Sequence, residues 1–526
     1  MKYIYIFLPV LLLMSSCSKF LDEYSTDLKY VQNTDDLNKL MIGEAFINSV
    51  SLSAYSDQET MGDLSETGLT APWLHVMDDD SEQFVLGFAD TDKPTPLYKL
   101  SAFHNWSQSP AVNVLNLSWE EVLWRKIYKR VGAINAILFQ ASKLAETSDN
   151  STLQHIRGEA YFLRAYYYYL LQNVYGSPYR VSSAATDEGV PLKISEKVED
   201  NYFKRDNNDK IYKQIVADLE QAEQYLQGYN PATKVRVGIA AVKILQSRIY
   251  LYTEQYDKAI AACKSFGTMG YTLNDLNLYS PDANFTYRSS TESIFTMGPN
   301  SVPAVFVNDS TSNNNGNDRL ASSFKASSTL ISSYASDDLR LNVFFKRSAK
   351  TKSWLPAKYR SWQAYNDPEQ VSCIFSFRYA EVILNNAEAL AMTGANEDAR
   401  NEIQKLRLKR FRNAGMDQIP TGNQELVEFI RAERRRELCF EGHRWFDLRR
   451  YAVNSKYPLS QDFNIKHPAY SYNAQTNANT PIGNYVLKSF AQDAPSWQVP
   501  IPNYAIEFNR GTLTNPIRSV RTVQPL

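Results

Sequence analysis

Residues 249–261 read IYLYTEQYDKAIA and lie within a longer stretch, residues 237–266, that has the pattern of two helices joined by a turn. Apolar side chains that recur every three or four residues are typical of a helix with one buried face. The same period marks further segments on both sides of this stretch. They cover residues 119–138, 153–171, 209–226, 379–409, 424–440 and 443–451. The sequence therefore predicts a mostly α-helical protein.

The quoted stretch resembles a tetratricopeptide repeat, in which a small residue lies where two helices cross and an aromatic side chain fills the gap. Ala259 has the position of the small residue. A second, weaker match covers residues 387–399 and includes Ala399. Because these two alanines are 140 positions apart, the repeats are dispersed along the chain and do not form a tandem array.

Long polar insertions separate the helical segments, at about residues 51–110 and 274–370. They contain many Gly, Pro, Asn and Asp residues, which favour turns and loops, and residues 454–496 are similar. The helical scaffold is expected mainly in residues 115–270 and 375–455. Long loops on a rigid body often carry binding sites, so the two large insertions are expected to form the ligand face.

The composition is that of an ordinary globular protein, with 44% hydrophobic residues, 21% charged residues and a formal net charge of −1. It excludes a collagen, a coiled coil and a largely disordered chain. A balanced charge also lacks the broad positive field that favours nucleic acid, so no nucleic-acid partner is expected. The 34 Tyr, 25 Phe and 8 Trp suit either a helical core or a surface that stacks on sugars.

Residues 1–16 have the pattern of an export signal, with Lys2 followed by a short apolar run and then small residues. The apolar run is too short to span a bilayer, which needs about 20 residues. No later apolar segment of that length is free of charged residues, so no transmembrane helix is expected.

The segment that follows the apolar run, residues 13–17, reads LMSSC and resembles a bacterial lipobox, although Met14 stands where Leu is commoner. This resemblance implies cleavage before Cys17 and acylation of that cysteine, which leaves residues 17–526 as a single lipid-anchored body. Two or three acyl chains suffice for stable membrane attachment. The alternative is an ordinary signal peptide with an incidental cysteine.

The other cysteines are Cys263, Cys373 and Cys439, too few and too scattered for a disulfide framework. None has a Cys or His at metal-ligand spacing, so neither a metal nor another cofactor is expected. Cys263 and Cys439 lie in helical patterns and are interpreted as buried apolar residues.

A dense charged block, residues 433–449, reads ERRRELCFEGHRWFDLR. Glu433, Glu437 and Glu441 are four residues apart and share one helical face. Paired carboxylates can hydrolyse glycosidic bonds, but ion pairs between helices use the same residue types. Because arginines lie within helical reach of each carboxylate, the block is interpreted as structural. No other catalytic motif is present, so no enzyme is expected.

Six blocks resemble, in the same order, the SusD/RagB family of outer-membrane lipoproteins. They are residues 17–22, 119–138, 157–164 with 175–176, 379–384 with 387–389, 433–449, and 499–502 with 509 and 515–516. The block at 433–449 is the most specific, and Thr514 departs from the Gln that is frequent in the family. The resemblance implies a helical scaffold of four tetratricopeptide-like units whose irregular insertions form the ligand face.

Members of this family are surface-exposed lids. Each docks on a SusC-like, TonB-dependent transporter, captures a nutrient, most often a glycan, and passes it to the transporter for import. The resemblance therefore implies a lipid-anchored protein on the cell surface of the outer membrane. Its implied partners are that transporter and an oligosaccharide or polysaccharide, while a peptide ligand stays open.

Aromatic side chains of the insertions are the candidate ligand contacts, because a sugar ring can pack its C–H bonds on an aromatic face. Trp119, Trp124 and Trp445 lie in helical segments and are interpreted as core. Four other tryptophans lie in the insertions beside polar residues, and at least two are expected to line one exposed face near Tyr365. They are Trp73, Trp106, Trp354 and Trp362. The alternative is that each aromatic only pins its own insertion.

Other functions remain open at this point. The main alternative is a tetratricopeptide-type lipoprotein that scaffolds envelope proteins without a small ligand, and a neighbouring gene for a TonB-dependent barrel would argue against it. A glycan hydrolase is a third possibility and would require turnover by the purified protein.

Overall fold

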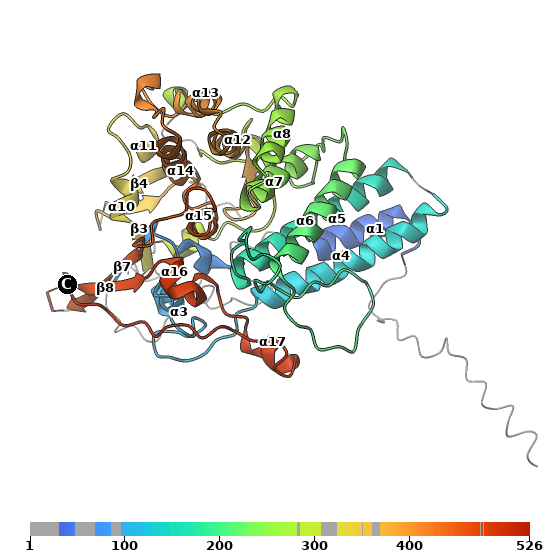
Figure 1. Cartoon of the computed structure of the whole chain (residues 1–526), viewed down its shortest axis with the longest axis horizontal. Coiled ribbons are helices and arrows are strands. Elements are labelled where there is room, and N and C mark those ends of the chain that lie inside the picture. The colour runs from blue at the N-terminus through green and yellow to red at the C-terminus, as the bar shows by residue number, and fades with distance from the viewer. Residues whose placement is uncertain are drawn as a thin grey trace, which may run out of the picture.

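The computed structural model describes residues 31–47, 69–85, 96–148, 150–280, 284–306, 323–349, 351–359, 369–473, 475–476 and 478–526. Helices dominate this part of the chain, which confirms the predicted mostly α-helical fold (Figure 1). The long helices are α4 (Leu123–Ala145), α5 (Ser151–Tyr175), α6 (Asn208–Tyr225), α7 (Ile239–Tyr252), α8 (Tyr256–Lys264), α12 (Tyr379–Thr393), α13 (Asn396–Arg407), α14 (Asn423–Leu438) and α15 (Arg444–Ala452). Shorter ones are α1 (Thr34–Leu40), α3 (Pro96–His104), α9 (Val302–Val305), α10 (Ser328–Ile331), α11 (Arg340–Phe344), α16 (Phe490–Asp493) and α17 (Asn503–Phe508).

Helices that follow one another in sequence pack together, as α4 with α5, α5 with α6, and α12 with α13. Figure 1 shows α4, α5 and α6 side by side on the right of the view, with α12, α13 and α14 grouped at the upper left. The ends are set locally. The Asn150 side chain accepts from Leu153 N–H at the start of α5, and Gly394, with φ of 86°, ends α12. Each predicted helical segment is found, but α4 begins at Leu123 and leaves Trp119 in the preceding loop.

The two dispersed repeat matches meet in space. The first forms helices α7 and α8, the second forms α12 and α13, and α8 packs against α12. Ala259, Ala387 and Ala399 are fully buried in the apolar core that these helices share. Small residues at the crossings let the helices approach closely, as the repeat pattern predicts.

The described parts of the insertions contain short strands, and many of their residues are buried. Short antiparallel pairs join β1 (Ser81–Phe84) to β3 (Ser323–Ala326), β2 (Ser293–Thr296) to β6 (Ser376–Arg378), β4 (Phe345–Arg347) to β5 (Trp354–Pro356), and β7 (Ile465–Asn473) to β8 (Ala478–Leu487). The β1–β3 pair ties the first large insertion to the second. Residues 69–85 are almost entirely buried, so the first insertion enters the core.

Three further sequence predictions concern thiols and the membrane. Cys263 and Cys439 are buried free thiols, as expected, and Cys373 is buried as well. None of the described helices has the length and apolar character needed to cross a bilayer. The predicted signal and Cys17 lie outside the described residues.

Candidate functional site

The carboxylates that suggested catalysis are buried in an ion-pair network. Glu437 accepts hydrogen bonds from Arg340 Nη1 at 3.2 Å, Arg378 Nη1 at 2.7 Å and Arg410 Nε at 2.9 Å. Its neighbour Glu441 accepts from Arg378 and from Lys358 Nζ at 2.6 Å. All of these side chains are at most 5% exposed. The network ties α14 to distant segments, and its geometry agrees with the structural interpretation of the block.

Two buried carboxyls with arginine partners, those of Glu433 and Glu388, have strongly lowered pKa values. Burial alone would raise the pKa of Glu433, but Arg340 and Arg436 outweigh it and lower that pKa to about 2. Burial also raises the pKa of Glu388, but Arg450 and Arg431 outweigh this effect and lower that pKa to about 2. The ordinary pKa of a glutamate side chain in water is 4.5.

These lowered pKa values predict a loss of stability in acid. A carboxyl whose pKa is lower in the folded state stabilises the fold above its unfolded-state pKa, and that contribution disappears as pH falls toward the folded-state value. We expect the free energy of unfolding to fall between about pH 4.5 and pH 2, by on the order of 3 kcal/mol for each group. Urea titrations between pH 7 and pH 3 would measure this, and an unchanged midpoint at pH 3 would contradict it.

Two of the four predicted sugar-stacking tryptophans, Trp73 and Trp106, are buried in the core. Trp73 is 1% exposed and stacks on Phe103 with ring centroids 4.8 Å apart. Trp106 is 0% exposed, and its indole N–H donates to the Met77 carbonyl at 2.9 Å. Neither of these two can therefore be among the tryptophans that were predicted to line an exposed face, and the prediction is left to Trp354 and Trp362. The large apolar rings of Trp73 and Trp106 are buried because the first insertion crosses the core.

The other predicted contacts have different positions. Trp354 is half-buried in β5, opposite Arg347 of β4. Trp362 and Tyr365 lie outside the described residues. Trp124 and Trp445 are buried, as predicted for core residues.

A groove of about 630 Å³ lies elsewhere, between the loop before α4 and the C-terminal segment. Its walls are formed by Phe103 and by residues 108–112, 118–121, 499–504 and 515–518. A backbone hydrogen bond within the first wall closes its loop, and another pins the second wall to the scaffold. Trp119 N–H donates to the Ala111 carbonyl at 3.0 Å, and Val499 N–H donates to the Val174 carbonyl of α5 at 2.9 Å.

The groove combines aromatic faces with polar groups. Trp119 and Tyr504 are both half-buried and line it, and the ring of Trp119 lies 5.8 Å from that of Phe103. Gln108, Ser109 and Asn503 line the groove and contribute amide and hydroxyl groups. Few convergent polar groups on an apolar wall are typical of small-ligand sites. This arrangement suits a ligand with an apolar face and hydroxyl groups at its edge.

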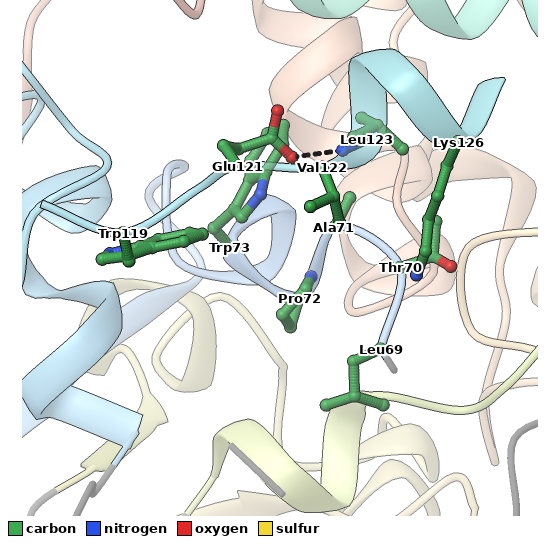
Figure 2. A pocket seen from close by; sticks show the side chains of 10 residues that line it. All are labelled: Leu69, Thr70, Ala71, Pro72, Trp73, Trp119, Glu121, Val122, Leu123 and Lys126. Atoms are coloured by element: carbon green, nitrogen blue, oxygen red, sulfur yellow. Dashed lines mark hydrogen bonds between the residues drawn. The ribbon is translucent and has the colours of Figure 1, made fainter. Parts of the chain in front are cut away.

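A small inner pocket of about 10 Å³, about the size of one water molecule, adjoins the groove because Trp119 and Glu121 line both. Figure 2 shows Trp119 and Trp73 on one side of this pocket and Lys126 on the other. Glu121 accepts from Leu123 N–H at 2.8 Å and from Tyr175 O–H at 2.6 Å. Burial raises the pKa of Glu121 despite these donors. They hold its carboxylate in place behind Trp119.

Among the described residues, one cluster of carboxylates has the spacing of a possible metal site. It consists of Asp78, Asp79 and Asp80, whose carboxylate oxygens lie within 4.8 Å of one another. Two of these three carboxylates are already bound by arginine side chains. Arg444 binds Asp79 through two hydrogen bonds of 2.7 and 2.9 Å, and Arg435 Nε donates to Asp80 at 2.7 Å. The cluster fixes the first insertion to α14 and α15.

Comparison with known proteins identifies the same family that the sequence blocks resemble. A sequence model of the SusD family matches residues 291–517, and a second, described as starch-binding and associating with the outer membrane, matches residues 77–251. The chain belongs to the SusD family. It is 22% identical over 383 residues to SusD-like protein P2 of Formosa agariphila, which covers 63% of this chain and 72% of that protein.

Solved structures share the fold of this SusD-family protein. A SusD superfamily protein from Bacteroides thetaiotaomicron aligns with a TM-score of 0.66 and 20% identity, over 92% of this chain and all of that one. Surface glycan-binding protein A from Bacteroides uniformis aligns with a TM-score of 0.64 and 18% identity, over 92% of this chain and 99% of that one. The fold expected from the resemblance is thus confirmed.

Sequence reasoning missed the groove because it placed Trp119 inside a helix as a core residue. The structure starts α4 four residues later, at Leu123, and leaves Trp119 half-buried at the groove. A signal was available in the two asparagines and the serine that precede it, Asn113, Asn116 and Ser118, which favour a loop.

Proposed function

We propose that this protein is a lipid-anchored, surface-exposed member of the SusD family that captures a glycan at the outer membrane. It then delivers the glycan to a SusC-like, TonB-dependent transporter. Membership of the family supports this proposal, and so do the descriptions of relatives as starch-binding or glycan-binding. The proposed ligand site is the groove between Trp119 and Tyr504.

The observation that carries the proposal is the pairing of two half-buried aromatic rings with amide and hydroxyl groups in one groove. A ring held by its surroundings loses little freedom when a sugar packs on it. The Tyr504 ring is held in this way, because Arg125 N–H donates to its hydroxyl at 3.3 Å and the Arg125 guanidinium lies 5.5 Å from the ring centroid.

Trp119→Ala is expected to weaken glycan binding by roughly five- to a hundredfold, on the scale of the ~1–3 kcal/mol that a base gains by stacking on an aromatic side chain. The melting temperature should change little, because Trp119 is only half-buried. A glycan panel screened by calorimetry on the purified wild-type protein and the variant measures both. If no glycan binds the wild-type protein, the proposed function is wrong.

Trp354→Ala is the matched control for the position of the site. Trp354 is also half-buried, but it lies in β5 and does not line the groove. With Trp362 and Tyr365 it makes up the stacking surface proposed from sequence. A loss of binding in Trp354→Ala, with normal binding in Trp119→Ala, would move the site to that insertion.

We propose no catalytic activity for this protein. The carboxylates of residues 433–449 that could act on a glycosidic bond have arginine or lysine partners inside the core. Incubation of a bound glycan with the purified protein should therefore leave it intact, and released product would overturn this part of the proposal.

A further inference from the structure

The groove holds a buried cation, Arg518, that forms no ion pair with a carboxylate of the described residues. Arg518 is 4% exposed and lines the groove. Within the described part of the chain, it donates one hydrogen bond, from Nη1 to the Ser107 carbonyl at 2.5 Å, and its buried Nε–H has no acceptor. A buried guanidinium with unused donors is unfavourable unless another acceptor is bound.

Arg449 and Arg521 also have a buried Nε–H without an acceptor, but the rest of each guanidinium has partners that Arg518 lacks. Arg449 is also buried without a carboxylate, but it donates to two backbone carbonyls, those of Asn173 and Gly176. Arg521, three residues beyond Arg518, is paired with Asp493. Neither of these two lines the groove. Arg518 differs from both, because it lines the groove and has a single backbone carbonyl as its acceptor.

The carboxylates of the groove already have partners. Glu120 pairs with Arg125. Glu121 accepts from Tyr175 and from the backbone of Leu123, so it is not a partner for Arg518. Burial and repulsion from Arg521 outweigh the attraction of Asp493 and lower the pKa of Arg518 to about 10. An anion bound beside Arg518 would offset both the burial of its charge and the repulsion from Arg521, because a nearby negative charge favours the charged guanidinium.

A second unused donor lies in the same walls. The indole N–H of Trp119 is buried and has no acceptor within the described part of the chain. Together, Trp119 and Arg518 offer donors at one groove, while its carboxylates are engaged elsewhere. The groove is therefore short of acceptors, which a ligand with oxygen atoms could supply.

We propose that the glycan bound in this groove carries an oxyanion, either a carboxylate or a sulfate ester, and that Arg518 binds it. The proposal rests on the proposed function and specifies its ligand class. A guanidinium matches the planar spacing of two oxygens in such groups and binds them with charge-assisted hydrogen bonds. Trp119 and Tyr504 contact the sugar ring, so stacking and charge act on the same ligand.

The test compares three galactose-based ligands of equal length by calorimetry: a neutral galactan oligosaccharide, an oligogalacturonate and a sulfated galactan oligosaccharide. At least one anionic ligand is expected to bind tenfold or more tightly than the neutral one. The uronate and sulfate arms then identify which oxyanion is preferred. Arg518→Gln should remove this preference, and Arg518→Lys should keep part of it.

Arg510→Gln is the matched control, because Arg510 is an exposed arginine of the same segment that does not line the groove. It should bind all three ligands as the wild-type protein does. If the neutral ligand binds as well as the anionic ones, or if Arg518→Gln weakens all three alike, the inference is overturned and the proposed function stands. If none of the ligands and no other glycan binds, both fail.

The wild-type protein provides a second measurement in case Arg518→Gln does not fold. Raising the salt concentration should weaken binding of the anionic ligand several-fold, because salt screens charge–charge attraction, and should leave the neutral ligand almost unaffected. Anionic binding that is independent of salt overturns the inference.

Discussion

Glu437→Ala is expected to lower the free energy of unfolding by about 3–5 kcal/mol, the usual cost of removing one partner from a buried ion pair. The cost should lie at the upper end, because Glu437 is the shared acceptor of Arg340, Arg378 and Arg410. All three arginines would stay buried with less compensating charge. Against a typical total stability of about 5–15 kcal/mol, such a loss is large.

Thermal and urea unfolding measure this loss, with Glu428→Ala as the matched control. Glu428 lies on the same helix, α14, but is exposed, and its replacement should change stability by less than about 0.5 kcal/mol. A Glu437→Ala protein that melts like the wild-type protein but no longer binds glycan would show that the charged block is a binding site.

Cys17→Ala is expected to abolish membrane attachment altogether. Residues 13–17 resemble a lipobox, and without the thiol no diacyl chain can be added. Because the described helices offer no alternative span, the protein would have lost its proposed anchor. Fractionation of cells and labelling with a radioactive fatty acid would measure attachment and acylation.

The control for this experiment is Ser18→Ala, which leaves the cysteine in place one residue earlier. It should remain lipidated and membrane-bound. Retention of Cys17→Ala in the membrane fraction, at the level of the wild-type protein, would refute lipid anchoring at this residue.

The helices were predictable because their signals are local. In α6, Ile211, Ile215 and Leu219 repeat at helical spacing, and Asn207 caps the first turn. Gly442 is another local signal, because its φ of 74°, which glycine adopts easily, lets the chain turn between α14 and α15. Spacing, caps and breakers each depend on a few neighbouring residues, so the sequence alone contains them. The division into scaffold and insertions stays a prediction.

The charged block was partly predictable. Its interpretation as structural agrees with the burial of Glu433 and Glu437, but the expected partners were the arginines nearby in sequence. Arg436 does pair with Glu433, three residues away. The partners of Glu437 instead come from outside the block, as with Arg340 and Arg410. Helical spacing cannot identify partners that only long-range packing brings close.

The candidate site was the least predictable part. Sequence position placed Trp73 and Trp106 in polar insertions and Trp119 in a helix, yet the first two are buried and the third lines the groove. Exposure depends on which segments cover a side chain, and these come from elsewhere in the chain. Trp106, for example, stacks on His467, which is 361 positions away.

The sequence by itself determined the helical class of the protein, its family and the expectation of a lipid anchor, because periodicity and short motifs record local preferences. Only the tertiary structure decided where the proposed ligand groove lies and which of its charges form ion pairs. That groove forms where residues 108–121 meet residues 499–518, nearly 400 positions apart. Its shape and its arginine without an ion pair depend on contacts between these segments, which no local pattern encodes.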